Sequence, residues 1–440
     1  MLIFGAAKQV VCLPPRFHPK FAMQEIAMKL NRTLPRVLSM AAAALASALL
    51  AGPAHAQSCG GDINNDGIVN SGDLATLLSN WGPCVVSAPT ISQVAPNSGP
   101  ATGGTVININ GTNLNRATSV TVGGVAATII AAYPTVIIAT TPASTSGGAK
   151  TVAVTTPGGT ASASNAFTYG AATPSWATLL EAAPDPAVVT NASMRTAIAA
   201  SGFAWRVRHT ATQIEMLLVP AGTYTMGCTA SATFGCDANE NPTRQVTITN
   251  AFYIGRFEVT QAQWTARMGS NPSNFQSASA QVPAAQVPNR PVESVSWTTV
   301  QGFLAATGMR LPTEAEWEYA SRAGTTTAFN NGSSDDTTAV NIAWYNANAL
   351  SQTRPVGGKA ANALGLHDMS GNVWEWVSDW FGAYAAGAQT NPTGPATGTN
   401  RVLRSGSWFY SANFMRSSAR GFNTPGFSGI DIGFRVARNP

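Results

Sequence analysis

Cysteine and histidine are the side chains best suited to metal or redox chemistry, and both are scarce in this 440-residue chain. Five cysteines and four histidines are present. Three of these nine residues, Cys12, His18 and His55, fall in an N-terminal leader that is described below. The remainder are Cys59, Cys84, Cys228, Cys236, His209 and His367. Two histidines are too few for a three-histidine iron or zinc site. The cysteines form two sequence-local pairs, Cys59 with Cys84 and Cys228 with Cys236, which predicts two disulfides; a metal-binding or catalytic thiol pair is the alternative.

An acidic loop over residues 62–73 is a candidate calcium site. It fits the D-x-[DN]-x-D-G pattern of an EF-type loop, with Gly67 at position six, where the backbone must turn sharply. The predicted ligands are Asp62, Asn64, Asp66, the carbonyl of Ile68, Asn70 and Asp73. We expect Ile68 and Val69 to anchor the loop to a core and a helix with an apolar stripe to follow over residues 74–78. A metal-free surface turn is the alternative.

This segment resembles a single dockerin type I repeat. Cys59 and Cys84 bracket it, and a disulfide between them would stabilise a unit too small to fold on its own core. Dockerin repeats normally occur as pairs and only one is found here, so cohesin is not expected as a partner.

Glu314 and Glu318 are spaced i, i+4, which would place two carboxylates on one helix face. An acid/base pair is one interpretation, but salt bridges or solvated faces are the favoured one. The helix itself is predicted over residues 313–322, because Thr313 and Glu316 form a T-x-x-E capping box. A second helix is predicted over residues 296–306.

The first 56 residues predict export. A basic stretch (Lys29 to Arg36) precedes an apolar segment that is too short to span a membrane, and Ala54-His55-Ala56 is a small-x-small cleavage site. We therefore expect Met28 to be the true start and the mature chain to begin at Gln57. No later segment is a transmembrane candidate, and the expected location is secreted or at the cell surface.

Charge excludes a nucleic-acid partner. The formal net charge is +5, but residues 1–56 carry six basic residues and one acidic residue, so 19 of each remain after them. A neutral mature chain has no basic patch of the kind that phosphate backbones require.

Residues 88–170 read as a small β-sandwich. Short β-branched runs (105–110, 119–122, 135–140 and 151–155) alternate with Gly/Pro turns, and Ile107 and Ile109 show period-two alternation. The motifs Pro96–Thr105, Gly111–Leu114 and Phe167–Tyr169 resemble the IPT/TIG family, which implies an immunoglobulin-like fold. The resemblance implies a spacer, with a binding domain as the alternative.

The last part of the chain is rich in aromatic residues, with eight of the eleven tryptophans beyond residue 213. We expect most of them to form a core, because large rings supply buried area to a fold with few long elements. Residues 171–212 are expected to be a linker with helical stretches at 176–182 and 192–200.

Five motifs in this region closely resemble the formylglycine-generating enzyme family, also called sulfatase-modifying factors. They are Phe252–Thr260, Pro291–Trp297, Arg310–Arg322, Gly365–Trp376, and Arg401–Trp408 followed by Gly433–Arg435. The resemblance covers about residues 213–440 and implies an irregular α+β fold related to C-type lectins. It also implies a structural calcium site formed by Asp368, the carbonyls of Gly371 and Val373, and Glu375. Hard oxygen ligands suit Ca²⁺.

The true oxidases of that family use copper and two C-terminal cysteines, and this chain departs from that pattern. Residues 406–416 contain no cysteine, and the last cysteine is Cys236. Copper(I) requires soft thiolate ligands, which Met415 does not replace, so copper is not expected as a cofactor. A Cys228–Cys236 pair meeting the site in space is the alternative to a simple loop disulfide.

The sequence thus predicts a multidomain exported protein. The expected parts are a leader (1–56), a dockerin-like calcium unit (57–87), an Ig-like sandwich (88–170), a linker (171–212) and a formylglycine-generating-enzyme-like domain (213–440). The last domain is expected to bind an unidentified protein or glycan, or to serve a structural role, without catalytic residues. A formylglycine-generating oxidase or another oxidoreductase on the same scaffold is the alternative.

Overall fold

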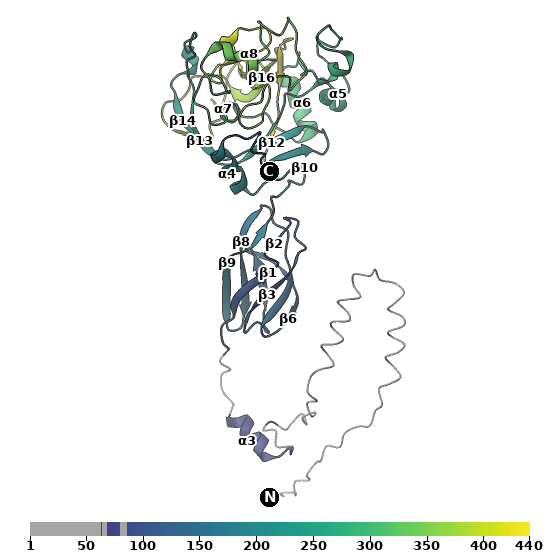
Figure 1. The fold of residues 1–440 in the computed structure, drawn as a ribbon, viewed down its shortest axis with the longest axis vertical. Helices are drawn as coiled ribbons and strands as arrows, with labels where there is room; N and C mark the ends of the chain where they lie inside the picture. The colour runs from purple at the N-terminus through teal and green to yellow at the C-terminus, as the bar shows by residue number, and fades with distance from the viewer. Residues whose placement is uncertain (1–62, 64–67, 80–85) are drawn as a thin grey trace, which may run out of the picture. The chain divides into compact units, whose positions relative to one another are not determined.

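The computed structural model describes residue 63, residues 68–79 and residues 86–440 (Figure 1). The chain divides into two units, Met1–Val86 and Ser87–Pro440. In the first unit, helix α3 (Ser71–Ser79) confirms the helix predicted to follow the acidic loop. Within the described residues, no helix combines the length and the apolar character needed to cross a membrane.

The second unit begins with a β-sandwich. One sheet has the order β1-β3-β7-β6 and the other β2-β9-β8-β4-β5. The strands are β1 (Thr90–Ala95), β2 (Ser98–Gly99), β3 (Val106–Thr112), β4 (Ser119–Val122), β5 (Val125–Ala126), β6 (Thr128–Ala132), β7 (Val136–Thr140), β8 (Gly148–Thr156) and β9 (Gly159–Tyr169). Ile107 and Ile109 are fully buried while Val106, the first residue of β3, is exposed, so the period-two prediction is confirmed. Of the four predicted β runs, 119–122 and 151–155 lie wholly within strands, and 105–110 and 135–140 do so except for their first residues.

Three further sheets form the C-terminal domain. Their orders are β10-β11-β12-β15-β21, β13-β14-β17 and β19-β18-β16-β20. The strands are β10 (Ala177–Glu181), β11 (Arg206–His209), β12 (Glu215–Val219), β13 (Gly222–Met226), β14 (Arg244–Ile248), β15 (Phe252–Gly255), β16 (Trp374–Trp380), β17 (Gln389–Thr390), β18 (Arg401–Arg404), β19 (Gly421–Asn423), β20 (Ile432–Phe434) and β21 (Ala437–Arg438).

Short helices complete this domain, and the predicted capping box is present. The helices are α4 (Ala192–Ser201), α5 (Gln261–Met268), α6 (Trp297–Thr307), α7 (Glu314–Arg322) and α8 (Ala339–Ile342). Single 3-10 turns lie at Ala238–Glu240, Ala284–Asn289, Asp336–Thr338 and Ala412–Met415. Thr313 caps α7 by accepting a hydrogen bond from Glu316 N at 3.1 Å, and the Glu316 carboxylate accepts one from Thr313 N in return.

Residues 171–212 differ from the predicted linker. The stretch expected to be helical at 176–182 is the strand β10, which pairs antiparallel with β11 from Ala177↔His209 onward. Pairing with a neighbouring strand overrides a weak helical propensity. The second stretch is helical, as α4. Because β10 and β11 share a sheet with β12, this segment is part of the C-terminal domain.

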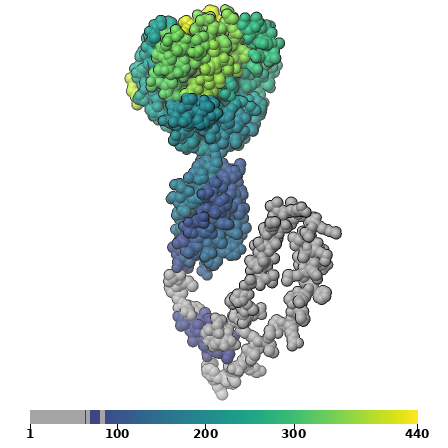
Figure 2. All heavy atoms as spheres, in the orientation of Figure 1, coloured from purple at the N-terminus to yellow at the C-terminus, as the bar shows by residue number. Residues whose placement is uncertain are grey.

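Aromatic side chains supply much of the C-terminal core. Five of the eight tryptophans beyond residue 213 are buried, namely Trp264, Trp317, Trp374, Trp376 and Trp408. Trp264 stacks on Phe303 of α6 with ring centroids 5.5 Å apart. In Figure 2, segments coloured from teal to yellow share the surface of this domain, so its early and late residues are interleaved. The prediction that most of these tryptophans are core residues is confirmed.

Candidate functional site

Helix α7 carries the two glutamates that were candidates for acid/base chemistry. Both are buried and ion-paired. Glu318 contacts Arg322 Nη2 at 2.8 Å and Arg404 Nη2 at 2.7 Å. Glu314 contacts Arg420 Nε at 2.6 Å and Arg404 Nη1 at 3.1 Å. We call these five side chains the α7 cluster.

The α7 cluster holds three guanidinium groups against two carboxylates. Burial raises the pKa of Glu314, but Arg420 and Arg404 outweigh it, so this pKa lies below its ordinary value. A carboxylate that is ionised and already paired with arginines is a poor proton donor at neutral pH. The predicted salt bridges are therefore confirmed, whereas solvated faces and an acid/base pair are not what the structure shows.

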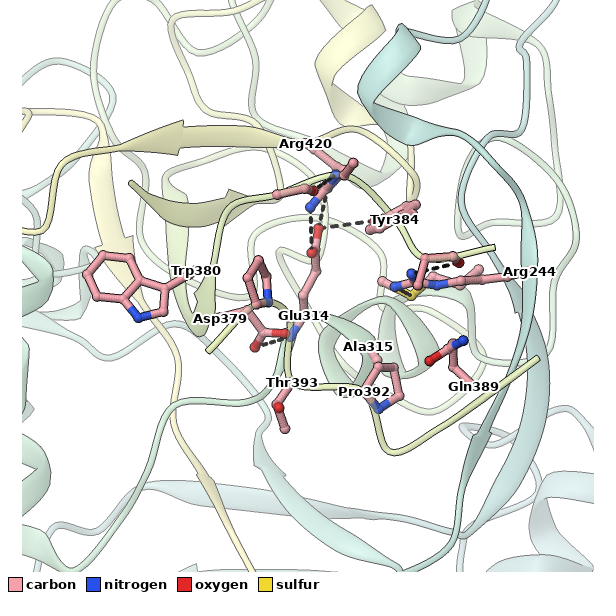
Figure 3. A pocket seen from close by; sticks show the side chains of 16 residues that line it. Arg244, Glu314, Ala315, Asp379, Trp380, Tyr384, Gln389, Pro392, Thr393 and Arg420 are labelled. Atoms are coloured by element: carbon pink, nitrogen blue, oxygen red, sulfur yellow. Dashed lines mark hydrogen bonds and ion pairs between the residues drawn. The ribbon is translucent and has the colours of Figure 1, made fainter. Parts of the chain in front are cut away.

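A cavity of about 340 Å³ lies beside the α7 cluster (Figure 3). Glu314 and Arg420 line it, and Arg244 extends from β14 toward it, with its guanidinium 4.1 Å from the Tyr384 ring centroid. Burial, with a contribution from Glu314, raises the pKa of Asp379 to about 7. Asp379 can therefore gain or lose a proton near neutrality. The lining includes no cysteine, histidine or serine that could act as a nucleophile.

The predicted calcium residues lie at the start of β16 and in the turn before it. Asp368 (φ 54°) and Gly371 (φ 80°) both adopt left-handed backbone, and a Cβ at Gly371 would lie 2.3 Å from the Trp344 carbonyl oxygen. Only glycine fits at that position. The carbonyl of Gly371 accepts a hydrogen bond from Ser405 Oγ at 3.1 Å.

The two predicted carboxylate ligands have different surroundings. Glu375 pairs with Arg435 at 2.6 Å and accepts a hydrogen bond from Trp317 Nε1 at 2.6 Å. Asp368 Oδ2 accepts one from Gly357 N at 2.7 Å, whereas its buried Oδ1 has no hydrogen-bond partner among the described residues. Burial raises the pKa of Asp368 to about 6.

Glu258 belongs to this site although no role was predicted for it. Its carboxylate accepts hydrogen bonds from Asn372 Nδ2 at 2.6 Å and Val373 N at 3.1 Å. Burial, Asp368 and Glu375 together raise its pKa well above the ordinary value. We call Glu258, Asp368, Glu375 and Arg435 the loop cluster. Glu258 and Arg435 both fall within the motifs that carry the family resemblance, which is the signal that could have identified them.

The loop cluster has some, but not all, of the features of a cation site. Three carboxylates are near one guanidinium, and Asp368 Oδ1 is free to coordinate an ion. Glu375 would have to share its oxygens between Arg435 and the ion. Within the described ranges, no group of three or more His, Cys, Asp or Glu side chains is arranged to hold a metal, so backbone carbonyls would have to complete the coordination.

The cysteines do not form a metal site in the described structure. Cys228 and Cys236 form a disulfide, as predicted, with Cα atoms 5.5 Å apart. Cys59 and Cys84 lie outside the described residues. In the 406–416 segment, Met415 is fully buried and Tyr410 packs edge-on against Trp374. Neither sulfur of the disulfide is a thiolate, so these residues do not fit copper(I).

The acidic loop is described only in part. Asp62, Asn64 and Asp66 lie outside the described residues. Asp73 is buried and its carboxylate accepts hydrogen bonds from Ile63 N and Asn70 N, both at 2.7 Å. The side chains of Ile68 and Val69 are exposed, so they do not anchor the loop to a core as predicted. Among residues 63 and 68–79, Asp73 alone is buried, so this described part offers no apolar core to them.

Two family models match this chain. The model described as "Sulfatase-modifying factor enzyme 1-like domain" matches residues 203–440, and the IPT/TIG domain matches residues 89–169. The structure of PvdO from Pseudomonas aeruginosa is similar to this chain, with 29% sequence identity and a TM-score of 0.44 over 52% of this chain and 95% of that chain.

Curated relatives match the C-terminal half. A formylglycine-generating enzyme of Streptomyces coelicolor is 39% identical over 170 residues, which cover 34% of this chain and 54% of the relative. The serine/threonine-protein kinase pkn1 of Chlamydia caviae is 31% identical over 245 residues, 51% of this chain and 38% of the relative. The chain therefore spans about half or less of the length of these two relatives.

Proposed function

Since this chain belongs to the sulfatase-modifying factor family through residues 203–440, we propose that it is an exported, modular member of that family that binds a ligand and does not oxidise thiols. The C-terminal domain would bind an unidentified protein or glycan, or serve a structural role, and the IPT/TIG domain would act as a spacer. The mature chain would be secreted or held at the cell surface.

One observation carries this proposal. The two cysteines in the described part of the family domain are joined to each other, and the sequence has no cysteine after Cys236. Copper-dependent oxidation of a thiol requires thiolates to hold the metal. The segment expected to provide them instead presents Ser407, Tyr410 and Met415. A fold can persist while its site chemistry is lost.

Calcium is proposed as a structural ion in two places. In the loop cluster, the open Oδ1 of Asp368 and the surplus of carboxylates support it. In the acidic loop, the ligand pattern of a dockerin-like unit supports it, with Cys59–Cys84 as the proposed second disulfide. An ion at either place would neutralise charge and order a loop, with no part in a reaction.

The alternative is a formylglycine-generating oxidase, and the identity of 39% to the Streptomyces coelicolor enzyme favours it. Copper(I) binding separates the two. The oxidised full chain, mixed with a coloured copper(I) chelator complex, should leave the colour unchanged. Loss of colour that disappears in a Cys228→Ser/Cys236→Ser variant would favour the oxidase and place the metal at that pair.

A further inference from the structure

Three cations on neighbouring loops of the C-terminal domain have no carboxylate within 4.0 Å among the described residues: Arg290, Arg354 and Lys359. They donate only to neutral oxygens. Arg290 Nη1 donates to Thr353 O at 2.9 Å, Arg354 Nε to Ala349 O at 3.1 Å, and Lys359 Nζ to Val340 O at 2.7 Å. This arrangement contrasts with the α7 cluster, in which every arginine has a carboxylate partner.

These cations are close enough to repel one another. Burial and then Arg354 lower the pKa of Arg290, and the same two causes in the same order lower that of Lys359. Glu293 offsets part of the effect on Arg290. Arg290 and Arg354 are also buried, at 1% and 7% exposed. Buried cations without counter-charges are costly, so an anion at this place would be stabilised.

A cavity of about 490 Å³ opens beside Arg354. Its lining combines three kinds of residue: the cation Arg354, the aromatic residues Phe257 and Trp344, and the amide residues Gln281, Gln286 and Asn289. The volume falls in the range of small-molecule sites, and it exceeds what an inorganic ion would fill. Lys359 Nζ lies 4.0 Å from the Trp344 ring centroid, so a second cation contacts a side chain that lines the cavity.

Hydrogen-bonding groups without partners occur on the lining of this cavity. Trp344, which lines it, has a buried Nε1 donor with no acceptor in the described part of the chain. The amide side chains of Gln286 and Asn289 are exposed, and each could both donate and accept. Donors without acceptors indicate a ligand that is rich in oxygen.

We propose that this cavity binds an acidic sugar, meaning a saccharide that carries a carboxylate or a sulfate group. The acidic group would lie against Arg354, whose planar fork matches two oxygens at once. The hydroxyl groups would meet the amides, and the sugar ring would pack on Phe257 and Trp344. The inference rests on the proposed binding role and names its ligand class.

Calorimetric titration of the full chain tests the proposal. Glucuronate and glucose 6-sulfate carry both features, glucose lacks the acid, and inorganic sulfate lacks the sugar. At least one acidic sugar should bind about tenfold or more tightly than glucose and than inorganic sulfate, because hydrogen bonds to charged groups are the stronger ones. If neither acidic sugar binds, the proposal is overturned. If inorganic sulfate binds as tightly as the acidic sugars, the sugar part of the proposal is overturned.

Variants locate the site. Arg354→Gln should weaken acidic-sugar binding about tenfold or more. Because Arg354 also supports its loop through Ala349, Gln286→Ala provides a second variant at an exposed side chain, with an expected loss of about threefold. Lys150→Gln, in the β-sandwich, is the matched control and should bind as the unmodified chain does. Binding that is unchanged in both cavity variants would overturn the assignment. None of these readings involves copper or thiol oxidation, so failure here is distinguishable from failure of the proposed function.

Discussion

The α7 cluster and the loop cluster are equally buried but differ in how their carboxylates are neutralised. In the α7 cluster, two glutamates meet three arginines, and the pKa of Glu314 is lowered despite its burial. In the loop cluster, three carboxylates are near one arginine, and the pKa values of Glu258 and Asp368 are raised. The number of arginine partners, and not the depth of burial, decides the direction of the shift.

The charges of the α7 cluster are neutralised within the cluster, whereas those of the loop cluster are not. The α7 cluster satisfies its own charges, and it connects α7 to β18 and to Arg420, about 100 residues away in the sequence. The loop cluster carries carboxylates that a cation would stabilise. The first cluster should therefore respond to loss of a partner, and the second to addition of an ion.

Loss of a carboxylate from the α7 cluster should have the largest effect. Glu318→Gln leaves buried Arg322 without its counter-charge and buried Arg404 with Glu314 alone, and breaking a buried pair costs about 3–5 kcal/mol. Urea unfolding measures the loss. Glu181→Gln, which removes a more exposed partner of Arg206, is the control and should cost less than about 1 kcal/mol. Similar losses in the two variants would show that the α7 cluster contributes no more than a surface pair.

Calcium should stabilise the loop cluster. At about 100 times its dissociation constant, a bound ion raises the free energy of unfolding by about 2.7 kcal/mol. Tryptophan fluorescence during unfolding reports on the C-terminal domain, which holds most of the tryptophans. Asp368→Ala should remove the gain, whereas Asp62→Ala, in the acidic loop, should keep it. A gain that survives Asp368→Ala would place the ion elsewhere.

Loss of the Cys228–Cys236 disulfide, which lies next to the α7 cluster, should have a somewhat smaller effect on the free energy of unfolding. It closes a short loop next to Gly227, whose carbonyl accepts from Arg322 Nη2 at 2.8 Å and whose N–H donates to Glu318. Replacing both cysteines with serine should cost about 2–3 kcal/mol through loop-closure entropy. Urea unfolding of the oxidised chain and the variant measures this. Free thiols in non-reducing peptide maps would contradict the pairing.

Asp379 provides the most specific test, because its effect is confined to one pH window. Its native pKa is about 7, above its value in the unfolded chain, so the native state holds an extra proton between about pH 4 and pH 7. Its contribution to stability is therefore lost as pH rises, by up to about 1.4 kcal/mol per pH unit in that window. Asp379→Asn should flatten this part of the curve of unfolding free energy against pH. An unchanged slope would show that Asp379 is ionised throughout.

Local signals in the sequence predicted the sandwich strands and several helices, and they failed where distant residues meet. The period-two pattern of Ile107 and Ile109 predicts the sandwich, and the Thr313 capping box predicts α7, because both depend on neighbours in sequence. Residues 176–182 became a strand because β11 pairs with them. Glu314 pairs with Arg404 and Arg420, which lie about 90 and 106 residues away in the sequence, so spacing could not identify them.

Residues of the loop cluster could be predicted from the sequence only where a family motif names them as ligands. Asp368 and Glu375 were identified from the Gly365–Trp376 motif, but Glu258 and Arg435 were not, although they lie in motifs of their own. The proposed acidic ligand could not be predicted from the sequence either, because unpaired cations become visible only once every carboxylate has been placed in three dimensions.

This family member, as proposed, does not oxidise thiols. The most direct measurement is mass spectrometry of a peptide carrying the sulfatase cysteine motif after incubation with the full chain, copper(I) and oxygen. A formylglycine-generating enzyme run in parallel confirms that the conditions support turnover. With this protein, only unmodified cysteine should be recovered. A product with the aldehyde mass, absent in the Cys228→Ser/Cys236→Ser variant, would contradict it and assign the chemistry to that pair.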